Sequence, residues 1–390
     1  MKGRLQPTPR ATATVLTIAL LATGCGTTAR QAATPPTENT AAQLSLATSV
    51  ATATRNWAVL VLGDSADSAD DFWQLLARPA TGGSWRLVTP PGVASNGGLV
   101  VAPTGTSSLL AGFLPSQELR FTPLATTANA GATWSAAILN AHLADTPDAL
   151  AADPGTGKLL ALLTDGTLRQ STNGGRTWST IATKHAIATT QAGRHCGLVQ
   201  LTGTAFSPAG DPMLAGDCSN KGQTGIFALT GGTWQPAGPE LPAAQSTRPA
   251  TTISITSSAG ITQALLALGD GATTSLIAAS YAGDPARWTL SQPFTVGSEK
   301  VLSVSTGSNG VTAVLLSGRR GLLLAGAAAD WRRLPKLPPA TQALAAGPGA
   351  ELQALTGTRT TVGVWTLNDS RSDWTQVQHL SVPVQFGSSG

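Results

Sequence analysis

Cysteine thiols carry the most distinctive chemistry in this chain of 390 residues, which contains three of them. Two strand-like segments, one beginning at Cys196 and one ending at Cys218, flank a turn signal, Ser-Pro-Ala-Gly, at residues 207–210. A hairpin centred near this turn would place the two thiols opposite each other, within reach of a disulfide. The alternative is a metal site built on His195, Cys196 and Cys218, but the segment has no CxxC pair and no fourth ligand. We predict the disulfide and no metal.

The remaining polar residues do not form a recognisable catalytic motif. The sequence has no G-x-S-x-G nucleophile elbow, no HExxH helix and no phosphate-binding loop. The most polar insertion contains Lys184, His185, Arg194 and His195, and we take it as the candidate binding loop. We predict no catalytic residue and no cofactor.

Composition excludes nucleic acid as a partner. Charged residues make up 11 % of the chain, against about 25 % in an average globular protein. The formal net charge is +4, and loss of Lys2, Arg4 and Arg10 with a cleaved N-terminal segment would lower it to +1. The other cations are scattered, so there is no basic stripe to follow a phosphate backbone.

The N-terminus has the order of a secretory signal peptide. A basic start is followed by the apolar run of residues 11–23, which is 13 residues long. A helix needs about 20 apolar residues to span a bilayer, so this run is too short for a stable anchor. We predict that residues 1–24 are a signal peptide and that the chain is exported. Export would place Cys196 and Cys218 where disulfides form.

The segment ends in Leu-Ala-Thr-Gly before Cys25, which resembles a bacterial lipobox. A Leu is commonest three residues before the lipidated Cys, but here Ala22 holds that place and Leu21 lies one further back. The resemblance implies that Cys25 carries a lipid and holds the protein on the extracytoplasmic side of the cell membrane. An ordinary signal peptide is the alternative. Residues 25–42 are rich in Thr, Ala and Pro and are predicted to be a flexible tether.

Two segments of the chain fit the pattern S/T-x-N/D-x-G-x-T-W. They are residues 127–134 and 171–178, and their key positions are Asn129, Gly131, Trp134, Asn173, Gly175 and Trp178. This pattern resembles the Asp-box, or BNR repeat, of sialidase-like β-propellers. In that motif the Asn accepts hydrogen bonds from the turn, the Gly supplies a positive φ, and the Trp packs between sheets. The implied role is structural.

Tryptophans recur along the chain with a period typical of a propeller blade. The series is Trp85, Trp134, Trp178, Trp234, Trp288, Trp331 and Trp374, with steps of 43 to 56 residues. A four-stranded blade takes about 40–55 residues. We therefore predict an all-β fold over residues 43–390, a seven-bladed β-propeller of four-stranded antiparallel blades, with six or eight blades as alternatives. Residues 381–386 could close the ring by pairing near Trp57.

A sialidase-like enzyme would need clustered Arg residues, a Tyr–Glu nucleophile pair and an Asp acid/base. The chain has one tyrosine, Tyr281, which the repeat places in the outer part of a blade. We therefore predict a non-enzymatic binding or docking module, as in Ycf48-like propellers, with an unknown protein or polysaccharide at the propeller rim. The alternative is an exo-glycosidase acting on surface glycans. A cluster of three Arg with a Glu–Tyr pair at the channel mouth would favour the enzyme, and a Thr-, Ser- and Ala-lined channel with one apolar or charged patch at the rim would favour docking.

Overall fold

The computed structural model describes most of the chain after residue 48. The described residues are 49–62, 72–90, 98–113, 122–139, 147–258, 260–269, 273–282, 287–307, 310–326, 329–346, 351–358, 360–368 and 372–382. All of them belong to one compact unit, residues 42–390. The predicted signal peptide, Cys25 and the tether lie outside them. Among the described helices, none combines the length and apolar character needed to cross a bilayer.

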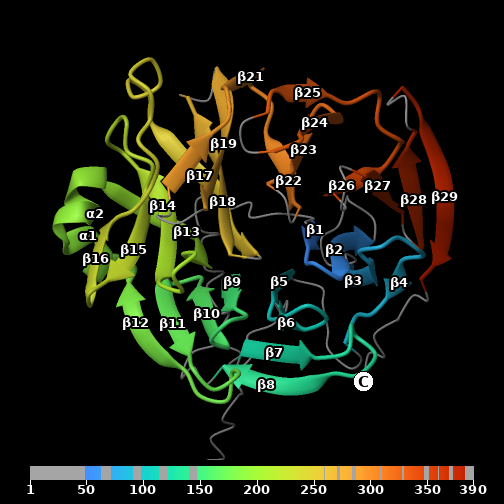
Figure 1. Ribbon diagram of the computed structural model, residues 1–390, viewed down its shortest axis with the longest axis horizontal. Coiled ribbons are helices and arrows are strands. Elements are labelled where there is room, and N and C mark those ends of the chain that lie inside the picture. The colour runs from blue at the N-terminus through green and yellow to red at the C-terminus, as the bar shows by residue number, and fades with distance from the viewer. Residues whose placement is uncertain are drawn as a thin grey trace, which may run out of the picture. The chain divides into compact units, whose positions relative to one another are not determined.

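The unit is built from antiparallel meanders of four strands that follow one another along the chain (Figure 1). The first three meanders consist of β1 (Ser49–Ala51), β2 (Arg55–Leu62), β3 (Phe72–Pro79) and β4 (Arg86–Leu87); β5 (Leu99–Pro103), β6 (Leu109–Phe113), β7 (Thr122–Thr127) and β8 (Ser135–Leu139); and β9 (Pro147–Asp153), β10 (Lys158–Leu163), β11 (Thr167–Ser171) and β12 (Ser179–Thr183).

Two short helices, α1 (Lys184–Thr189) and α2 (Gln191–Cys196), separate β12 from the meanders of the second half. These meanders consist of β13 (Leu198–Phe206), β14 (Pro212–Cys218), β15 (Ile226–Thr230) and β16 (Thr233–Pro236); β17 (Ala250–Ser258), β18 (Ile261–Leu268), β19 (Thr274–Ala282) and β20 (Arg287–Leu290), with β21 (Phe294–Gly297) added to β19; β22 (Val301–Thr306), β23 (Thr312–Leu316), β24 (Arg320–Leu324) and β25 (Trp331–Arg333); and β26 (Thr341–Ala346), β27 (Leu352–Gly357), β28 (Thr361–Leu367) and β29 (Trp374–Ser381).

Burial within a meander follows strand position. Second strands such as β6 and β23 are buried at every residue, and their sequences, LLAGF and TAVLL, are nearly continuous apolar runs. Such runs are expected where a strand is covered on both faces of its sheet. The last strands, such as β16 and β29, are mostly exposed and polar. Each sheet is therefore packed on both sides and meets solvent at its last strand.

Clusters of buried apolar residues fill the space between successive meanders. Six clusters in the described part of the chain join each meander to the next along the chain. A further cluster joins Leu60 and Leu76 of the first meander to Leu355 and Val364 of the last. The meanders thus close into a ring, with their first strands nearest its centre (Figure 1). This arrangement is a β-propeller.

Each periodic tryptophan packs against a different one of these clusters. Trp85 packs against the cluster between the last and first meanders. The six clusters that follow around the ring are contacted, in chain order, by Trp134, Trp178, Trp234, Trp288, Trp331 and Trp374. Trp85 and Trp331 are buried, and the other five are half-buried. The period in the sequence therefore records one indole ring for each gap between meanders.

The first strand pairs with two meanders. Besides its antiparallel partner β2, β1 pairs in parallel with β22, with Ser49 opposite Ser305 and Val50 opposite Thr306. The Ser49 and Ser305 hydroxyls lie 2.5 Å apart, and the Ser49 hydroxyl also donates to the Leu344 carbonyl at 3.1 Å. The N-terminal strand thus ties the first meander to the last two at the centre of the ring.

Ring closure differs from the predicted pairing of residues 381–386 with the first meander. Ser381 ends β29 and pairs with Thr361 of β28, while residues 383–386 lie outside the described part. Val382 packs into the cluster shared by the first and last meanders. In the described part of the chain, side-chain packing and hydrogen bonds, such as that from Ser49 to the Leu344 carbonyl, join the first and last meanders.

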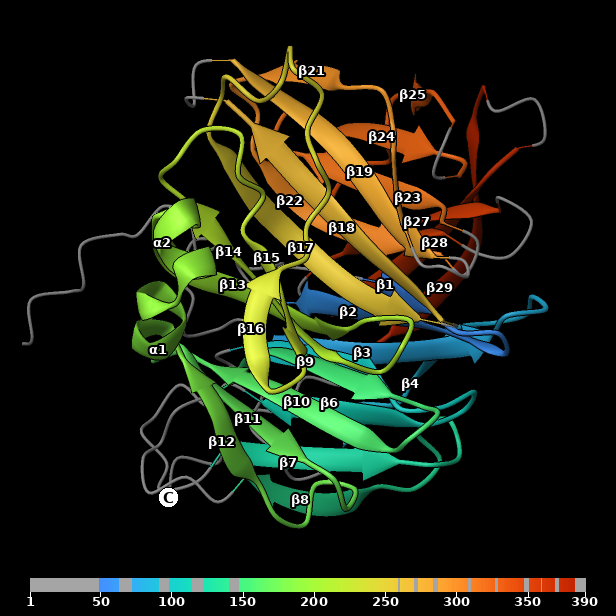
Figure 2. The same cartoon turned by 60° about the vertical axis from the view of Figure 1, so that its left-hand side comes forward.

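The segment after β12 was predicted to be a loop followed by a strand at Cys196, and it forms two helices instead. Thr183 and Thr190 cap their N-termini through side-chain hydroxyls, and Gly197 ends α2 with a φ of 63°. Ile187 and Cys196 are buried against the third and fourth meanders. Figure 2 shows the helix pair beside β12 and β16, outside the sheets. Capping and these buried residues stabilise helices too short to form alone.

Candidate functional site

The two Asp-box-like turns contain the same hydrogen bonds. In the first, Asn129 Oδ1 accepts from the Thr133 amide at 2.9 Å, and Asn129 Nδ2 donates to the Thr133 hydroxyl at 2.8 Å. In the second, Asn173 makes the same two bonds to Thr177 at the same distances. A hydroxyl two residues before each Asn accepts from the amide of Gly131 or Gly175 at 2.9 Å. These contacts hold the turns and leave no group directed at a ligand.

The indole groups of the two turns differ in their partners. Trp134 Nε1 donates to the Val88 carbonyl of the preceding meander at 2.9 Å, whereas Trp178 Nε1 donates to Gly175 within its own turn at 3.0 Å. Gly131 and Gly175 both have positive φ, 80° and 86°. A Cβ at Gly131 would overlap the Val88 side chain, so this glycine also allows the turn to approach the neighbouring meander.

A third turn of this kind was missed in the sequence. Asn368 Oδ1 accepts from the Ser372 amide at 2.9 Å, and Asn368 Nδ2 donates to the Ser372 hydroxyl at 3.2 Å. The Asn-to-hydroxyl spacing of four residues matches the other two turns, but one extra residue precedes Trp374. A search that allowed this insertion would have found it.

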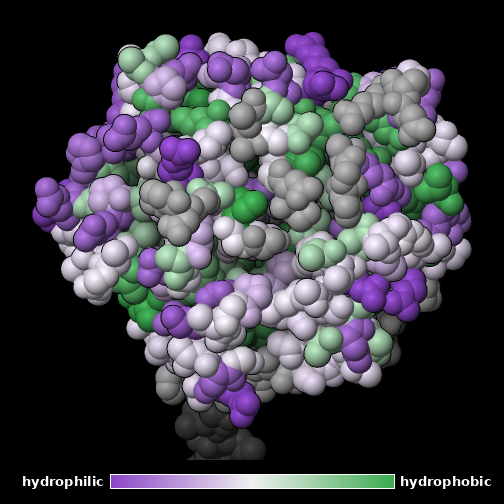
Figure 3. Space-filling model, in the orientation of Figure 1, coloured by the Kyte–Doolittle hydropathy of each residue, from purple (hydrophilic) through white to green (hydrophobic). Residues whose placement is uncertain are grey.

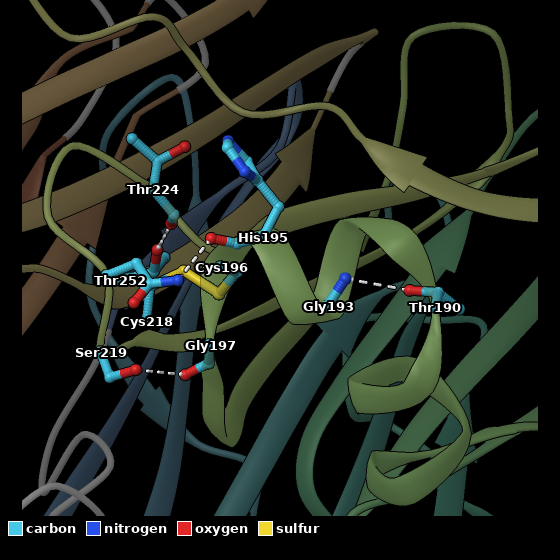
Figure 4. The surroundings of a disulfide bond; sticks show 10 residues. Thr190, Gly193, His195, Cys196, Gly197, Cys218, Ser219, Thr224 and Thr252 are labelled. Carbon is cyan, nitrogen blue, oxygen red and sulfur yellow. Dashed lines mark hydrogen bonds between the residues drawn. A yellow bond between two sulfur atoms is a disulfide. The ribbon is translucent and has the colours of Figure 1, made fainter.

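Cys196 and Cys218 form the predicted disulfide, with their Cα atoms 4.9 Å apart. Cys196 ends α2 rather than starting a strand, and Leu198 lies opposite Cys218 in the β13–β14 pair. Figure 4 shows the His195 ring directed away from the sulfur atoms. Because the two sulfurs are bonded to each other, they are not available as the metal ligands of the alternative reading.

The four residues of the candidate binding loop lie on the surface of the helix pair. Lys184, His185, Arg194 and His195 are all exposed. Arg194 donates to the Thr189 carbonyl, and the His195 carbonyl accepts from Asn220 Nδ2 at 2.8 Å. None of the four lines the grooves found in the described part of the protein. The structure brings them together as a polar surface, not as a pocket.

One buried carboxylate lies next to the disulfide. Asp217 is 9 % exposed and accepts a hydrogen bond from Gln200 Nε2 at 2.8 Å. Burial raises the pKa of Asp217 above its ordinary value, and hydrogen bonds from Gln200 and Thr251 offset this in part. Its Oδ1 atom has no hydrogen-bond partner among the described residues. Asp217 therefore carries an electrostatic cost of folding at neutral pH.

The first strands around the ring present a uniform lining. They consist mainly of Ser, Thr, Ala and branched aliphatic residues, and the charged residues on them are Asp148 and Asp153, both on β9. Hydroxyls join these strands to one another: Thr202 Oγ1 donates to the Thr252 carbonyl at 2.9 Å. Tyr281 lies on β19, a third strand. The described first strands thus carry no Arg, Glu or Tyr of a sialidase-like centre.

A groove of about 620 Å³ lies between the meanders β13–β16 and β17–β20. Its lining combines aromatic rings with charged and amide groups that were not recognised together in the sequence: Asp211, Gln235, Glu240, Tyr281, Arg287 and Trp288. The turn between β13 and β14 supplies Asp211, and the start of β20 supplies Arg287 and Trp288. Since ligand pockets commonly join apolar rings to a few polar groups, we take this groove as the candidate site.

An aromatic pair forms one wall of the groove. Tyr281 and Trp288 lie opposite each other in the β19–β20 ladder, and their ring centroids are 5.0 Å apart with an interplanar angle of 25°. Trp288 Nε1 donates to the Ala237 carbonyl at 2.7 Å, which fixes the indole against the neighbouring meander. Both rings are half-buried. The strand register and this hydrogen bond therefore hold a rigid aromatic surface at the groove.

The polar groups of the groove carry both signs of charge. Glu240 and Arg287 are exposed, and no hydrogen bond or ion pair joins their side chains to another described residue. Asp211 is half-buried, and its Oδ2 lies 3.5 Å from the Ser207 hydroxyl. Gln235 Nε2 donates to the Thr233 hydroxyl at 3.2 Å. The groove thus offers two carboxylates, one guanidinium and one amide to a ligand.

No large apolar area occupies the face seen in Figure 3, where hydrophobic residues form small patches among polar and neutral ones. The exposed large apolar side chains of the described residues are Val199 and Val377, on the separate strands β13 and β29. Protein interfaces that depend on apolar burial usually present a larger continuous patch. As a candidate binding feature, the groove is therefore more specific than the scattered apolar side chains of the surface.

The fold and the groove define a β-propeller with a site between two meanders, away from its centre. Neither a protein-family model nor a curated protein matches the chain. Its structure is similar to the GH74 xyloglucanase from Xanthomonas campestris, with a TM-score of 0.51 and 15 % identity over 80 % of this chain and 53 % of the xyloglucanase. The chain thus spans about half the length of that protein.

Two further solved structures resemble the chain. A protein from Lactobacillus plantarum has a TM-score of 0.52 and 11 % identity, covering 85 % of this chain and 97 % of its own. A structure of YCF48 bound to D1 peptide has a TM-score of 0.43 and 12 % identity, covering 83 % of this chain and 89 % of its own. At these identities the similarities concern the fold alone.

Proposed function

We propose that this chain is an exported, lipid-anchored, seven-bladed β-propeller that acts as a non-enzymatic binding module. The ligand binds in the groove walled by Tyr281 and Trp288. Seven periodic tryptophans, each packed against its own cluster, support the blade count. The lipobox-like sequence before Cys25 supports the anchor.

The groove is the observation that carries the binding role. It joins a fixed aromatic pair to charged groups, Glu240 and Arg287, whose side chains make no hydrogen bond or ion pair within the described part of the protein. Charged side chains without an intramolecular partner are free to pair with a ligand. By contrast, several hydroxyls of the Ser- and Thr-rich first strands have partners within the protein, as Thr202 donates to the Thr252 carbonyl and Thr204 to the Met213 carbonyl, and the described first strands carry no Lys or Arg. Binding therefore belongs to the groove and not to the ring centre.

Sedimentation with isolated cell envelopes of the source bacterium tests the role. The Cys25→Ser variant, which lacks the lipid but keeps the wild-type groove, should pellet with the envelopes. A groove variant that combines Tyr281→Ala with Arg287→Gln should remain in the supernatant. Equal pelleting of both proteins would place the binding surface elsewhere, and no pelleting of either would remove the support for an envelope ligand.

The anchor has its own test. When the full gene is expressed in the source bacterium, the wild-type protein should partition into the detergent phase of Triton X-114, and Cys25→Ser should partition into the aqueous phase. Mass spectrometry of the mature N-terminus should find a diacylglyceryl group on Cys25. An unmodified N-terminus upstream or downstream of Cys25 would leave an ordinary signal peptide as the explanation.

An exo-glycosidase is the second candidate, because two carboxylates, Asp211 and Glu240, line the groove. Glycosidases use such a pair as acid and as base or nucleophile. Fluorogenic glycosides and xyloglucan should remain intact with the wild-type protein if the binding role holds. Turnover that disappears in both Asp211→Asn and Glu240→Gln would replace the binding module by an enzyme.

A further inference from the structure

We infer that the groove between β16 and β20 binds a neutral saccharide chain, with a sugar ring against Tyr281 and Trp288 and its hydroxyls held by Glu240, Arg287 and Asp211. This inference rests on the proposed binding function and names the ligand class of the same site. It follows from three properties of the groove: its aromatic wall, its mixture of hydrogen-bonding groups and its size.

The aromatic wall suits a ligand with one flat apolar face. A pyranose ring presents a face of C–H groups, which packs on an aromatic ring, while its hydroxyls point outward along the ring edge. The Tyr281–Trp288 pair is fixed by strand register and by the Trp288–Ala237 hydrogen bond, so little freedom is lost when a sugar binds. Tyr281 also brings a hydroxyl that makes no hydrogen bond within the described part of the chain.

The polar groups suit a ligand that both donates and accepts hydrogen bonds. A sugar hydroxyl donates to the carboxylates of Asp211 and Glu240 and accepts from the guanidinium of Arg287. Neighbouring hydroxyls on one ring can use both kinds of group at once. Two carboxylates beside one guanidinium disfavour a phosphate or an acidic polymer, because like charges repel in a partly desolvated groove.

The size of the groove excludes a folded protein as the main occupant. Its volume of about 620 Å³ lies within the range of small-molecule sites, about 300–1,000 Å³. A stable protein interface covers about 800 Å² on each partner, which needs a broad surface. A saccharide of a few units fills the groove, and a longer polymer can continue past its open side between the outer strands β16 and β20.

A cationic ligand is the nearest competitor, since aromatic rings and carboxylates also attract cations. The two ligands respond differently to salt. Ion pairing in an open groove weakens strongly as the Debye length shortens, whereas ring packing and neutral hydrogen bonds change little. Retained affinity in high salt therefore supports the saccharide, and a loss of most affinity supports the cation.

Native gel electrophoresis in gels that contain a soluble polysaccharide provides the test. The probes are laminarin, galactomannan and xyloglucan as neutral polymers, alginate as an acidic polymer and poly-lysine as a cationic one. At least one neutral polymer should retard the wild-type protein, and calorimetry with oligosaccharides of that polymer should give its Kd. Alginate and poly-lysine should cause no groove-dependent retardation.

Matched variants assign the binding to the groove. Tyr281→Ala should weaken the Kd by about tenfold or more, as expected when a central aromatic contact is removed. Tyr281→Phe keeps the ring and should bind within a few-fold of wild type. Phe294→Ala is the control, because Phe294 also contacts a periodic tryptophan, Trp331, in a tilted pair with centroids 6.4 Å apart, but lies outside this groove. Equal thermal midpoints of Tyr281→Ala and wild type would exclude unfolding as the cause.

The outcomes separate this inference from the proposed function. If no neutral polymer binds while envelope sedimentation still depends on Tyr281 and Arg287, the binding module stands and the saccharide inference is overturned. If protease treatment of the envelopes then abolishes sedimentation, the ligand is a protein. If a polymer binds but Tyr281→Ala and Phe294→Ala affect it equally, the groove is not the site and both statements fail.

Discussion

Arg78 and Glu351 form an ion pair across the junction between the first and last meanders, with Nη1–Oε1 and Nη2–Oε2 distances of 3.1 and 3.3 Å. The Arg78 side chain is 1 % exposed and that of Glu351 is 35 % exposed. Arg78 also lies over the Trp85 ring, 5.3 Å from its centroid. Trp85 Nε1 donates in turn to Gln353 Oε1 at 2.7 Å, and Gln353 Nε2 donates to Glu351 Oε1 at 3.1 Å. One connected network of charge and hydrogen bonds thus joins the two ends of the ring.

Loss of Glu351 should destabilise the closed ring. In Glu351→Ala the buried Arg78 guanidinium loses two charge-assisted hydrogen bonds, which should lower the free energy of unfolding by about 1–3 kcal/mol. Adding Arg78→Met should recover part of this loss, because the uncompensated charge is removed with it. Urea unfolding followed by tryptophan fluorescence measures both effects.

The chain offers a matched control for this pair. Glu299 and Arg320 form a second ion pair, but the Arg320 side chain is 49 % exposed. Solvent screens such a pair, so Glu299→Ala should leave the urea midpoint nearly unchanged. Equal effects of Glu351→Ala and Glu299→Ala would show that burial at the ring junction does not set the contribution of the pair.

Stability should depend on pH through Asp217. Burial raises the pKa of Asp217 above its ordinary value of 3.8, so the folded state holds the proton more tightly than the unfolded state. Protonated Asp217 therefore contributes to the free energy of unfolding at low pH, and this contribution is lost as pH rises through the raised pKa. Asp217→Asn removes this charge and should unfold at a higher temperature than wild type at pH 7, with the gap closing toward pH 3.8. A gap for Asp217→Asn that stays constant with pH would exclude titration of Asp217 as its cause.

The repeat could be predicted because a tryptophan packs into the gap next to each blade. Trp134 and Trp178 follow identical Asn turns, and each ring fills the space next to its meander. Local chemistry of this kind is visible in sequence, as is the Cys196–Cys218 disulfide, although Cys196 lies at the end of α2 and not in the predicted strand. The Asn368 turn shows the limit, since a single inserted residue concealed the same hydrogen bonds.

The groove could not be predicted because its parts meet only after the ring has formed. Asp211 and Trp288 lie in different meanders, and the angle between neighbouring sheets decides whether they share a cavity. Tyr281 was correctly placed away from the first strands, but nothing local paired it with Glu240. The helix pair was missed for a related reason: its six-residue helices depend on burial of Ile187 against other strands.

Turn glycines should differ in importance according to what surrounds them. Gly131 and Gly174 have positive φ angles of 80° and 70°, but a Cβ at Gly131 would overlap Val88, and a Cβ at Gly174 would meet nothing within 4 Å. Alanine at either position should lower the free energy of unfolding by about 1 kcal/mol, because the backbone there is left-handed. Gly131→Ala should lower the free energy of unfolding by about 1–3 kcal/mol more, because the turn must move away from the preceding meander. Urea midpoints measure the difference, and equal losses would mean that the Val88 contact adjusts freely.

Removal of the disulfide should loosen the helix pair before it affects the rest of the ring. The bond closes a loop with a sequence separation of 22, and a loop of that order contributes about 3 kcal/mol by restricting the unfolded chain. The double variant Cys196→Ser, Cys218→Ser should therefore have a lower thermal midpoint than wild type, and reductant should lower the midpoint of wild type but not of the variant. Because the disulfide is the one covalent link between the end of α2 and β14, with hydrogen bonds of Asn220 beside it, limited proteolysis should cut the variant first within residues 184–196. First cleavage elsewhere, or a midpoint insensitive to reductant in wild type, would show that the caps and buried Ile187 hold the helices without the covalent bond.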